Sequence, residues 1–186
     1  MGNLAYAEEY DDDYKYEVIN GVEYAMAPPM VSHNKVIMNL SRIIASYLRG
    51  KRCQVFTDTG VLLGENEVIP DLLVVCDPSK IGEMYIEGAP DFVVEVLSHS
   101  TEKRDRTDKF QLYEKYGVKE YWIVDTWGKS VDVYKLQNEK FALTNIHRLP
   151  MEKTLRKEEQ AKLQLTIKLS LYDDLEFDVS EVFEGL

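Results

Sequence analysis

The chain of 186 residues has the length of one ordinary domain, and 45% of its residues are hydrophobic, which is enough for a substantial core. Its formal net charge of −11 excludes a basic coat that binds nucleic acid without selectivity, although a local basic groove on an acidic body stays open. No apolar run approaches the roughly 20 residues that span a bilayer, and the N-terminus lacks a secretory signal. We therefore expect a cytoplasmic protein that has no membrane contact.

The two cysteines, Cys53 and Cys76, lie in apolar stretches and lack the spacing of metal ligands. They predict reduced thiols in the core of a cytosolic protein.

The first predicted elements are a β-hairpin and a helix. Residues 16–26 predict the hairpin, because Asn20-Gly21 is the favoured two-residue turn. Ser32 predicts the N-cap of the helix, and Gly50 ends it. Its apolar side is formed by residues at helical spacing, namely Val36, Ile37, Leu40, Ile43, Ile44, Tyr47 and Leu48.

The other face of this helix carries Lys35, Arg42 and Arg49, which are seven residues apart and therefore form one stripe. No acidic residue occurs from position 31 to 52, which is unusual in so acidic a chain. Two interpretations stay open: a solvated cationic face, or a stripe that faces the phosphates of a nucleic acid.

The middle of the chain predicts short strands and one further helix. The segments are strands over 53–57 and 60–63, a turn over 65–67, a strand over 69–76, a polar connection over 80–88, a strand over 92–97 and a helix over 102–116 that Gly117 caps. The strands over 69–76 and 92–97 are apolar runs, which indicate burial on both faces.

The last third predicts a third core strand and more β-structure. The segments are a strand over 120–125, a turn over 127–129, a hairpin over 131–136 and 141–147, a charged stretch over 151–162, a strand over 163–171, and a short strand with a helical turn over 175–183. The strand over 120–125 closely follows the helix, as in a right-handed strand–helix–strand unit. Tyr121 and Trp122 are predicted to be core residues rather than base-stacking platforms.

Two acids interrupt the strands that are predicted to be buried. Asp71 begins the first strand, and Glu95 lies within the second. A buried carboxylate is costly unless it is paired or coordinated, and two neighbouring carboxylates repel unless a cation lies between them. Mg²⁺ suits such a pair, because it takes hard oxygen ligands, commonly one or two carboxylates with waters and a substrate phosphate. The pattern therefore indicates a divalent metal site.

The helix after Glu95 carries four cations, Lys103, Arg104, Arg106 and Lys109. Lys109 is three residues from Leu112 and four from Tyr113, so it borders the side that faces the sheet and is the best inward candidate. Lys103 and Arg106 are expected to reach solvent or a nucleic-acid backbone. An alternative is that Glu95 pairs with Lys109 or Arg104 in a purely structural ion pair.

The spacing of Pro70-Asp71 and Glu95-Val96-Leu97 resembles a variant of the PD-(D/E)XK nuclease core. More closely, the chain resembles the Uma2 (DUF820) restriction endonuclease family. The matching pieces are residues 16–21, His33, residues 69–71, residues 88–98, Asp105, Lys109, Tyr113 and residues 117–125.

The resemblance implies an α+β fold with a restriction-endonuclease-like core, in which a mixed β-sheet is flanked by α-helices. From the length of the chain we expect a single domain over residues 1–186. Within that domain we expect a flexible acidic tail over 1–13, the nuclease-like core over 16–136 and C-terminal strands over 137–186.

The same resemblance implies roles for individual residues. Asp71 and Glu95 would be metal ligands, with the Val96 carbonyl as a third. The lysine of the motif should stand two residues after the glutamate, where Leu97 stands; in this family it has moved to the next helix, at Lys109. That lysine would orient or activate water, or stabilise developing charge. Supporting candidates are Glu17, His33, Ser98 and Asp105.

A second Pro-Asp pair, Pro90-Asp91, lies close to Glu95. Asp91 and Glu95 are four residues apart on one strand and therefore face the same side. The core that the chain resembles takes its two acids from neighbouring strands, which favours Asp71 as the metal ligand and leaves Asp91 at the end of a loop.

The implied function is metal-dependent hydrolysis of phosphodiester bonds by an endonuclease, with Mg²⁺ or Mn²⁺ as cofactor and DNA as partner. Cutting both strands needs two sites, so a homodimer is expected. The candidates for contact with the nucleic-acid backbone are Lys35, Arg42, Arg49, Lys103 and Arg106. Two alternatives stay open: a non-catalytic binding or assembly module that retained the fold, and a nuclease that acts on RNA or branched DNA.

Overall fold

A six-stranded mixed sheet forms the centre of the computed structural model, which describes residues 15–150 and 165–186. The strands are, in spatial order, β11 (Lys140–Arg148), β10 (Ser130–Gln137), β9 (Glu120–Asp125), β8 (Phe92–Val96), β6 (Leu72–Val75) and β3 (Gln54–Thr57). β8 and β9 pair in parallel, and the other neighbours pair antiparallel. Every residue of β6 and β8 is buried, as their apolar runs predicted.

Two smaller sheets accompany the central one. The larger has the order β2 (Val22–Ala25), β1 (Tyr16–Ile19), β5 (Asn66–Val68), β4 (Val61–Leu63) and β7 (Ile86–Glu87). The other pairs β12 (Thr166–Lys168) with β13 (Glu176–Asp178). The predicted hairpin over 16–26 is confirmed, with Asn20 and Gly21 at positive φ.

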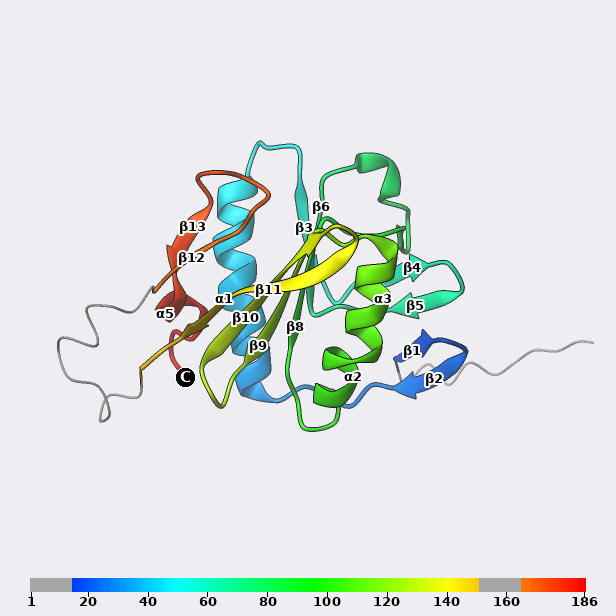
Figure 1. The fold of residues 1–186 in the computed structure, drawn as a ribbon, viewed down its shortest axis with the longest axis horizontal. Coiled ribbons are helices and arrows are strands. Elements are labelled where there is room, and N and C mark those ends of the chain that lie inside the picture. The colour runs from blue at the N-terminus through cyan, green and yellow to red at the C-terminus, as the bar shows by residue number, and fades with distance from the viewer. Residues whose placement is uncertain (1–14, 151–164) are drawn as a thin grey trace, which may run out of the picture.

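Helices cover both faces of the central sheet (Figure 1). They are α1 (Val31–Leu48), α2 (Glu102–Arg106), α3 (Asp108–Tyr116) and α5 (Val179–Val182), with a 3₁₀ helix at Pro78–Lys80. α1 packs on one face together with the C-terminal elements, and a first apolar core lies between them and the sheet. α3 and the five-stranded sheet pack on the other face, around a second core. The predicted α+β class, with a mixed sheet flanked by helices, is confirmed.

The periodicity of α1 is confirmed, because Val36, Leu40, Ile44 and Leu48 are buried on one side. The prediction that Ser32 caps this helix is wrong. The helix begins at Val31 after Met30, whose side chain forms no capping hydrogen bond and whose backbone is extended. Burial of the apolar face, rather than a polar cap, stabilises this helix start.

The prediction of one helix over 102–116 is also wrong, because Thr107 separates α2 from α3. Its backbone leaves the helical region, with φ −125° and ψ −78°. Its hydroxyl donates to the Lys103 carbonyl at 2.7 Å, a local bond that competes with helix continuation. Gly117, at φ 85°, caps α3 as predicted.

The turn predicted over 65–67 is wrong, because Asn66 begins strand β5. The buried Asn66 amide donates to the Leu63 carbonyl, and its oxygen accepts the Asn20 backbone N–H at 2.7 Å. The side chain thereby joins two hairpins, and the turn itself is confined to Gly64 and Glu65.

The prediction of reduced thiols is wrong as well, because Cys53 and Cys76 form a disulfide. The antiparallel pairing of Gln54 with Val75 places the two cysteines opposite each other, just beyond the ends of β3 and β6. This pairing joins residues 23 positions apart, so the spacing of the cysteines could not reveal it. The cysteines accordingly give no support for a cytosolic location.

The remaining predictions in the described part are confirmed or refined. The hairpin of β10 and β11 turns at Asn138 and Glu139, and the strand with a helical turn near the C-terminus is β13 with α5. The strand predicted over 163–171 is β12, three residues long. The acidic tail over 1–13 and the charged stretch over 151–162 lie outside the described residues. Across residues 15–150 and 165–186, no helix combines the length and apolarity needed to cross a bilayer.

Candidate functional site

The two predicted acids lie side by side at one end of the central sheet. Asp71 directly precedes β6, and Glu95 lies in β8; the register that pairs Leu72 with Val94 places Asp71 opposite Glu95 on the same face. The Val96 backbone N–H donates to Asp71 Oδ2 at 2.7 Å, which fixes the aspartate against the neighbouring strand.

Glu95 is held by two residues of α3. Its Oε1 accepts hydrogen bonds from Lys109 Nζ at 2.9 Å and from the Tyr113 hydroxyl at 2.7 Å. Lys109 and Tyr113 are four residues apart, so both project from one face of α3 onto the sheet. Both are buried, as is Glu95. The inward direction predicted for Lys109 is therefore seen in the structure.

Lys109 also joins Glu95 to the first hairpin. Its Nζ lies 2.6 Å from Glu17 Oε1 and 3.9 Å from Asp105 Oδ1. Glu17, in β1, also accepts the Ile69 backbone N–H at 2.9 Å. The Glu17 carboxylate thus connects the catalytic-lysine candidate to the backbone two residues before Asp71.

His33 and Arg104 complete what we call the charged cluster, which consists of Glu17, His33, Asp71, Glu95, Arg104, Asp105 and Lys109. His33 Nε2, in the first turn of α1, lies 3.2 Å from Asp71 Oδ2. Arg104 Nε lies 3.7 Å from Glu17 Oε2, and its guanidinium stacks over the Tyr24 ring at 4.6 Å.

The cluster carries more negative than positive charge. Counted formally, four ionised carboxylates face the two permanent cations Arg104 and Lys109, so two negative charges are in excess, and protonation of His33 would cancel one of them. Burial raises the pKa of Glu95, and the Asp105, Asp71 and Glu17 carboxylates raise it further against the opposing effect of Lys109. Burial also raises the pKa of Asp105, to about 6. A divalent cation would cancel this excess.

Several buried polar atoms of the cluster also lack hydrogen-bond partners among the described residues, namely Glu17 Oε2, His33 Nδ1, Arg104 Nε and Asp105 Oδ1. Such atoms are rare in folded proteins, and their concentration here indicates a site for a further polar group.

The donor set fits a hard divalent cation that keeps part of its water shell. The contacts of Asp71 reach Oδ2 and those of Glu95 reach Oε1, so Asp71 Oδ1 and Glu95 Oε2 are the oxygens that could coordinate. Within residues 15–150 and 165–186, no three His, Cys, Asp or Glu side chains are arranged to hold a metal by themselves. Mg²⁺ does not need such a cage, because it commonly binds through one or two carboxylates and waters.

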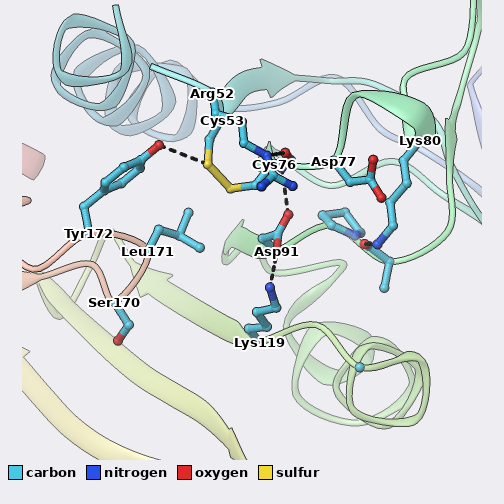
Figure 2. Close-up of a pocket in the computed structure, with 13 residues that line it drawn as sticks. Arg52, Cys53, Cys76, Asp77, Lys80, Asp91, Lys119, Ser170, Leu171 and Tyr172 are labelled. Atoms are coloured by element: carbon cyan, nitrogen blue, oxygen red, sulfur yellow. Dashed lines mark hydrogen bonds and ion pairs between the residues drawn. A yellow bond between two sulfur atoms is a disulfide. The ribbon is translucent and has the colours of Figure 1, made fainter. Parts of the chain in front are cut away.

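Asp91 lies at the other end of β8 and has structural partners. It accepts the Cys76 backbone N–H at 2.7 Å and pairs with Lys119 Nζ at 2.6 Å (Figure 2). It borders a pocket of about 670 Å³ that the Cys53–Cys76 disulfide also lines. The two Pro-Asp pairs therefore lie apart, because Asp71 is opposite Glu95 across the strands, whereas Asp91 lies at the other end of β8.

Ser98 bonds within its own turn, because its Oγ accepts the Thr101 backbone N–H at 3.2 Å and contacts the Thr101 hydroxyl at 2.9 Å. It shapes the turn that leads into α2. Asp105, by contrast, joins the charged cluster through its contact with Lys109.

The five basic residues considered for backbone contact fall in two places. On α1, Lys35 bonds the Gly185 carbonyl and Arg42 pairs with Glu184 at 3.1 Å, so both bind the C-terminal segment, and Arg49 is exposed near the helix end. On α2, Lys103 is exposed, and Arg106 pairs with Asp132 at 3.0 Å.

Two residues of the site have contacts that the sequence did not predict. Tyr113 was among the residues that carry the resemblance to the family. Its position four residues after Lys109 could have predicted that both side chains contact the same carboxylate. Arg104 was an alternative partner of Glu95, but its Nε lies 3.7 Å from Glu17 of the first hairpin, a tertiary contact that helical periodicity does not reveal.

The mixed sheet with helices on both faces has the restriction-endonuclease-like fold. A solved structure of this kind is similar over 90% of this chain and 89% of the other, with a TM-score of 0.66 and 20% identity; it is described as a putative nuclease belonging to DUF820 from Anabaena variabilis.

The chain belongs to the Uma2 family, described as "Putative restriction endonuclease", whose model matches residues 4–170. Two relatives come from Synechocystis and are both named as uncharacterized proteins. The relative slr1290 is 32% identical over 64% of this chain and 65% of its own length, a little under two thirds of that protein. The relative sll1609 is 27% identical over 71% of this chain and 78% of its own length.

Proposed function

We propose that this protein is a metal-dependent endonuclease that hydrolyses phosphodiester bonds, with DNA as the substrate and Mg²⁺ or Mn²⁺ as the cofactor. The observation that carries the proposal is the pairing of Asp71 with Glu95 across neighbouring strands, beside a buried lysine that contacts Glu95. Membership of the Uma2 family supports the same class of reaction.

Asp71 and Glu95 would hold the metal through Asp71 Oδ1 and Glu95 Oε2. The Val96 carbonyl is a third ligand candidate, because the N–H and C=O of one strand residue point to the same side and the Val96 N–H points at Asp71. When bound, a divalent ion neutralises charge on the phosphate and lowers the pKa of a coordinated water.

Lys109 serves as a fixed positive charge rather than as a base. Burial alone would lower its pKa, but the Glu95, Glu17 and Asp105 carboxylates outweigh this effect and raise the pKa above its usual value. A lysine that stays protonated cannot accept a proton from water. Its ammonium group can donate hydrogen bonds that orient a water or stabilise negative charge developing on the phosphate.

Glu17 and Tyr113 position these groups. Tyr113 and Lys109 share Glu95 Oε1, so Oε2 is left to face the metal site. Glu17 holds the lysine from the opposite side and fixes the backbone that leads to Asp71. The Asp71 carboxylate is in turn oriented by His33 and the Val96 N–H.

The test is cleavage of supercoiled, linear and branched DNA with Mn²⁺ or Mg²⁺, together with titration of Mn²⁺ binding. Asp71→Asn keeps the volume of the side chain and removes its charge. We expect it to abolish saturable Mn²⁺ binding and to slow cleavage on the order of 100-fold or more. Asp91→Asn is the matched control, since it changes the other Pro-Asp aspartate and should keep both properties.

Two results would overturn the proposal: a parent protein that cuts none of these substrates, or an Asp71→Asn variant that cuts as fast as the parent. The alternative, a non-catalytic module in which Glu95 and Lys109 form a structural ion pair, predicts a different result. Glu95→Gln would then lower the stability of the protein, while Mn²⁺ would bind to neither form. If the protein cut RNA in place of DNA, the proposed substrate would change and the proposed site residues would not.

A further inference from the structure

An exposed aromatic pair lies beside the candidate site. The rings of His99 and Trp127 stack with centroids 4.4 Å apart and planes 30° apart. Trp127 is 44% exposed, which is unusual for so large an apolar side chain, and His99 is exposed as well. Because His99 covers one face of the indole, the exposed area belongs to the rest of the ring.

The pair sits at the same end of the sheet as the charged cluster. β8 and β9 run parallel, with Glu95 opposite Ile123. His99 lies four residues beyond Glu95, and Trp127 lies four residues beyond Ile123. Four residues span at most about 14 Å, so the aromatic pair is within about 14 Å of Glu95 along the strand direction. In Figure 1 the β8–α2 loop and the β9–β10 turn both lie along the lower edge.

The backbone holds Trp127 in a defined turn. Its N–H donates to Asp125 Oδ1 at 2.9 Å. Gly128 follows, and a Cβ at that position would meet Asp125 Oδ2 at 2.5 Å, so another residue type would have to displace the carboxylate that holds the turn. The indole is therefore presented by a tight turn rather than by a loose loop, which lowers the cost of ordering it on binding.

We propose that the stacked His99–Trp127 pair binds a nucleobase, and that the substrate of the charged cluster therefore has unpaired bases next to the bond that is cut. This inference rests on the proposed nuclease function. The residues around the pair include Ser98, Ser100 and Asp125, so the surroundings are polar and suit one flat ring rather than the apolar face of a protein. A base inside a duplex has both faces covered, so it could stack here only when unpaired or terminal.

Stacking would also favour binding of a nucleic acid in a way that does not depend on the negative charge of the chain. A chain with a net charge of −11 gains little from general attraction to phosphates. Every base has a π-face, so stacking on an aromatic ring contributes without regard to charge or sequence. A strand with the rise of 3.4 Å per nucleotide covers about 14 Å in about four nucleotides. The stacked base would thus lie within about four nucleotides of the scissile phosphate.

The experiment measures binding separately from cleavage. In the Asp71→Asn background, the affinity for a labelled single-stranded oligothymidylate is compared with that for a fully paired hairpin and for an abasic strand of equal length. We expect Trp127→Ala to weaken binding of the single strand by roughly 5- to 150-fold, the range of one lost base stack. Trp127→Phe should restore most of the affinity. Leu143→Ala, at another exposed apolar residue, is the control and should change nothing.

Fluorescence gives a second readout, because Trp127 is one of two tryptophans and Trp122 is fully buried. The single strand should quench emission from Trp127, and the abasic strand should not. The ratio of affinities between parent and Trp127→Ala should also stay constant as salt rises, since stacking releases no counterions.

Two results would overturn the inference: equal affinity of Trp127→Ala and its parent for the single strand, or equal affinity of the parent for the abasic strand and the intact one. Either result would show that the His99–Trp127 contact only supports the fold. If the parent binds single strands through Trp127 but cuts nothing, the proposed nuclease function is wrong and base stacking at the His99–Trp127 pair is supported. If the parent cuts DNA and Trp127→Ala cuts and binds it equally well, base stacking at the His99–Trp127 pair is wrong and the proposed nuclease function is unaffected.

Discussion

Asp105 shows how an acid can be held at a site where its charge is unfavourable. It is buried, one carboxylate oxygen lacks a hydrogen bond, and its contact with Lys109 is long at 3.9 Å. Burial raises its pKa from 3.8 to about 6. The folded protein then takes up a proton that the unfolded chain has released, so the free energy of unfolding falls as the pH rises from about 4 to about 6.

Asp105→Asn should remove this pH dependence. Relative to the parent, the variant should gain about 2 kcal/mol between pH 4 and pH 6, which is the part of a shift of about two pKa units that titrates within this window. The measurement is urea unfolding across this pH range in the presence of a chelator, since a bound metal would change the balance of charge. Asp108→Asn, in the first turn of α3, is the control. A constant difference between parent and Asp105→Asn across the range would contradict the shift.

At the residue scale, the sequence could predict the residues whose neighbours are set by local periodicity. Asp71 and Glu95 stood out as acids in apolar strands, and the spacing of Lys109 from Leu112 and Tyr113 pointed it inward; the structure brings these groups together. It could not predict that Arg104 pairs with Glu17, because that contact depends on where the first hairpin packs against α2.

At the scale of elements, long apolar runs were predictable and pairings between distant segments were not. β6, β8 and β9 are buried along most of their length, and α1 buries one side at helical spacing, so apolar patterns mark these elements in the sequence. β5 is three residues long and begins with Asn66, whose side chain is satisfied by partners from two other segments. Such an element depends on tertiary contacts, which local propensity cannot supply.

The disulfide between β3 and β6 is a second product of distant pairing, and its energetic effect can be measured. Closing a loop of 23 residues restricts the unfolded chain and should stabilise the fold by about 3 kcal/mol. Reduction with dithiothreitol should therefore lower the urea midpoint of the parent protein. A Cys53→Ala, Cys76→Ala double variant should resemble the reduced parent and should not respond to the reductant. Identical unfolding curves for oxidised and reduced parent would show that the bond contributes nothing.

At the scale of the whole molecule, the C-terminal segment completes the core on the α1 side. Val182 and Phe183 belong to the same apolar cluster as Val36, Leu40 and Ile44. Polar contacts reinforce the packing, because the Asn39 side chain donates to the carbonyls of Val182 and Glu184 at 3.1 Å. α1 in turn carries His33 at its start, so the chain end supports the helix that orients Asp71.

This packing makes the expected single domain testable. If the chain is one domain, the C-terminal segment that follows the β10–β11 hairpin should unfold together with the central sheet. Phe183 is 2% exposed, so Phe183→Ala should remove about 3 to 5 kcal/mol from the free energy of unfolding. Urea unfolding should be followed by tryptophan emission, which reports on Trp122 in the central sheet, and by helical circular dichroism. Both midpoints should shift by the same amount, whereas Leu186→Ala, at an exposed residue of the same segment, should shift neither. If the dichroism signal moved and the emission signal stayed, the C-terminal elements would be a separate unit that unfolds from an intact sheet.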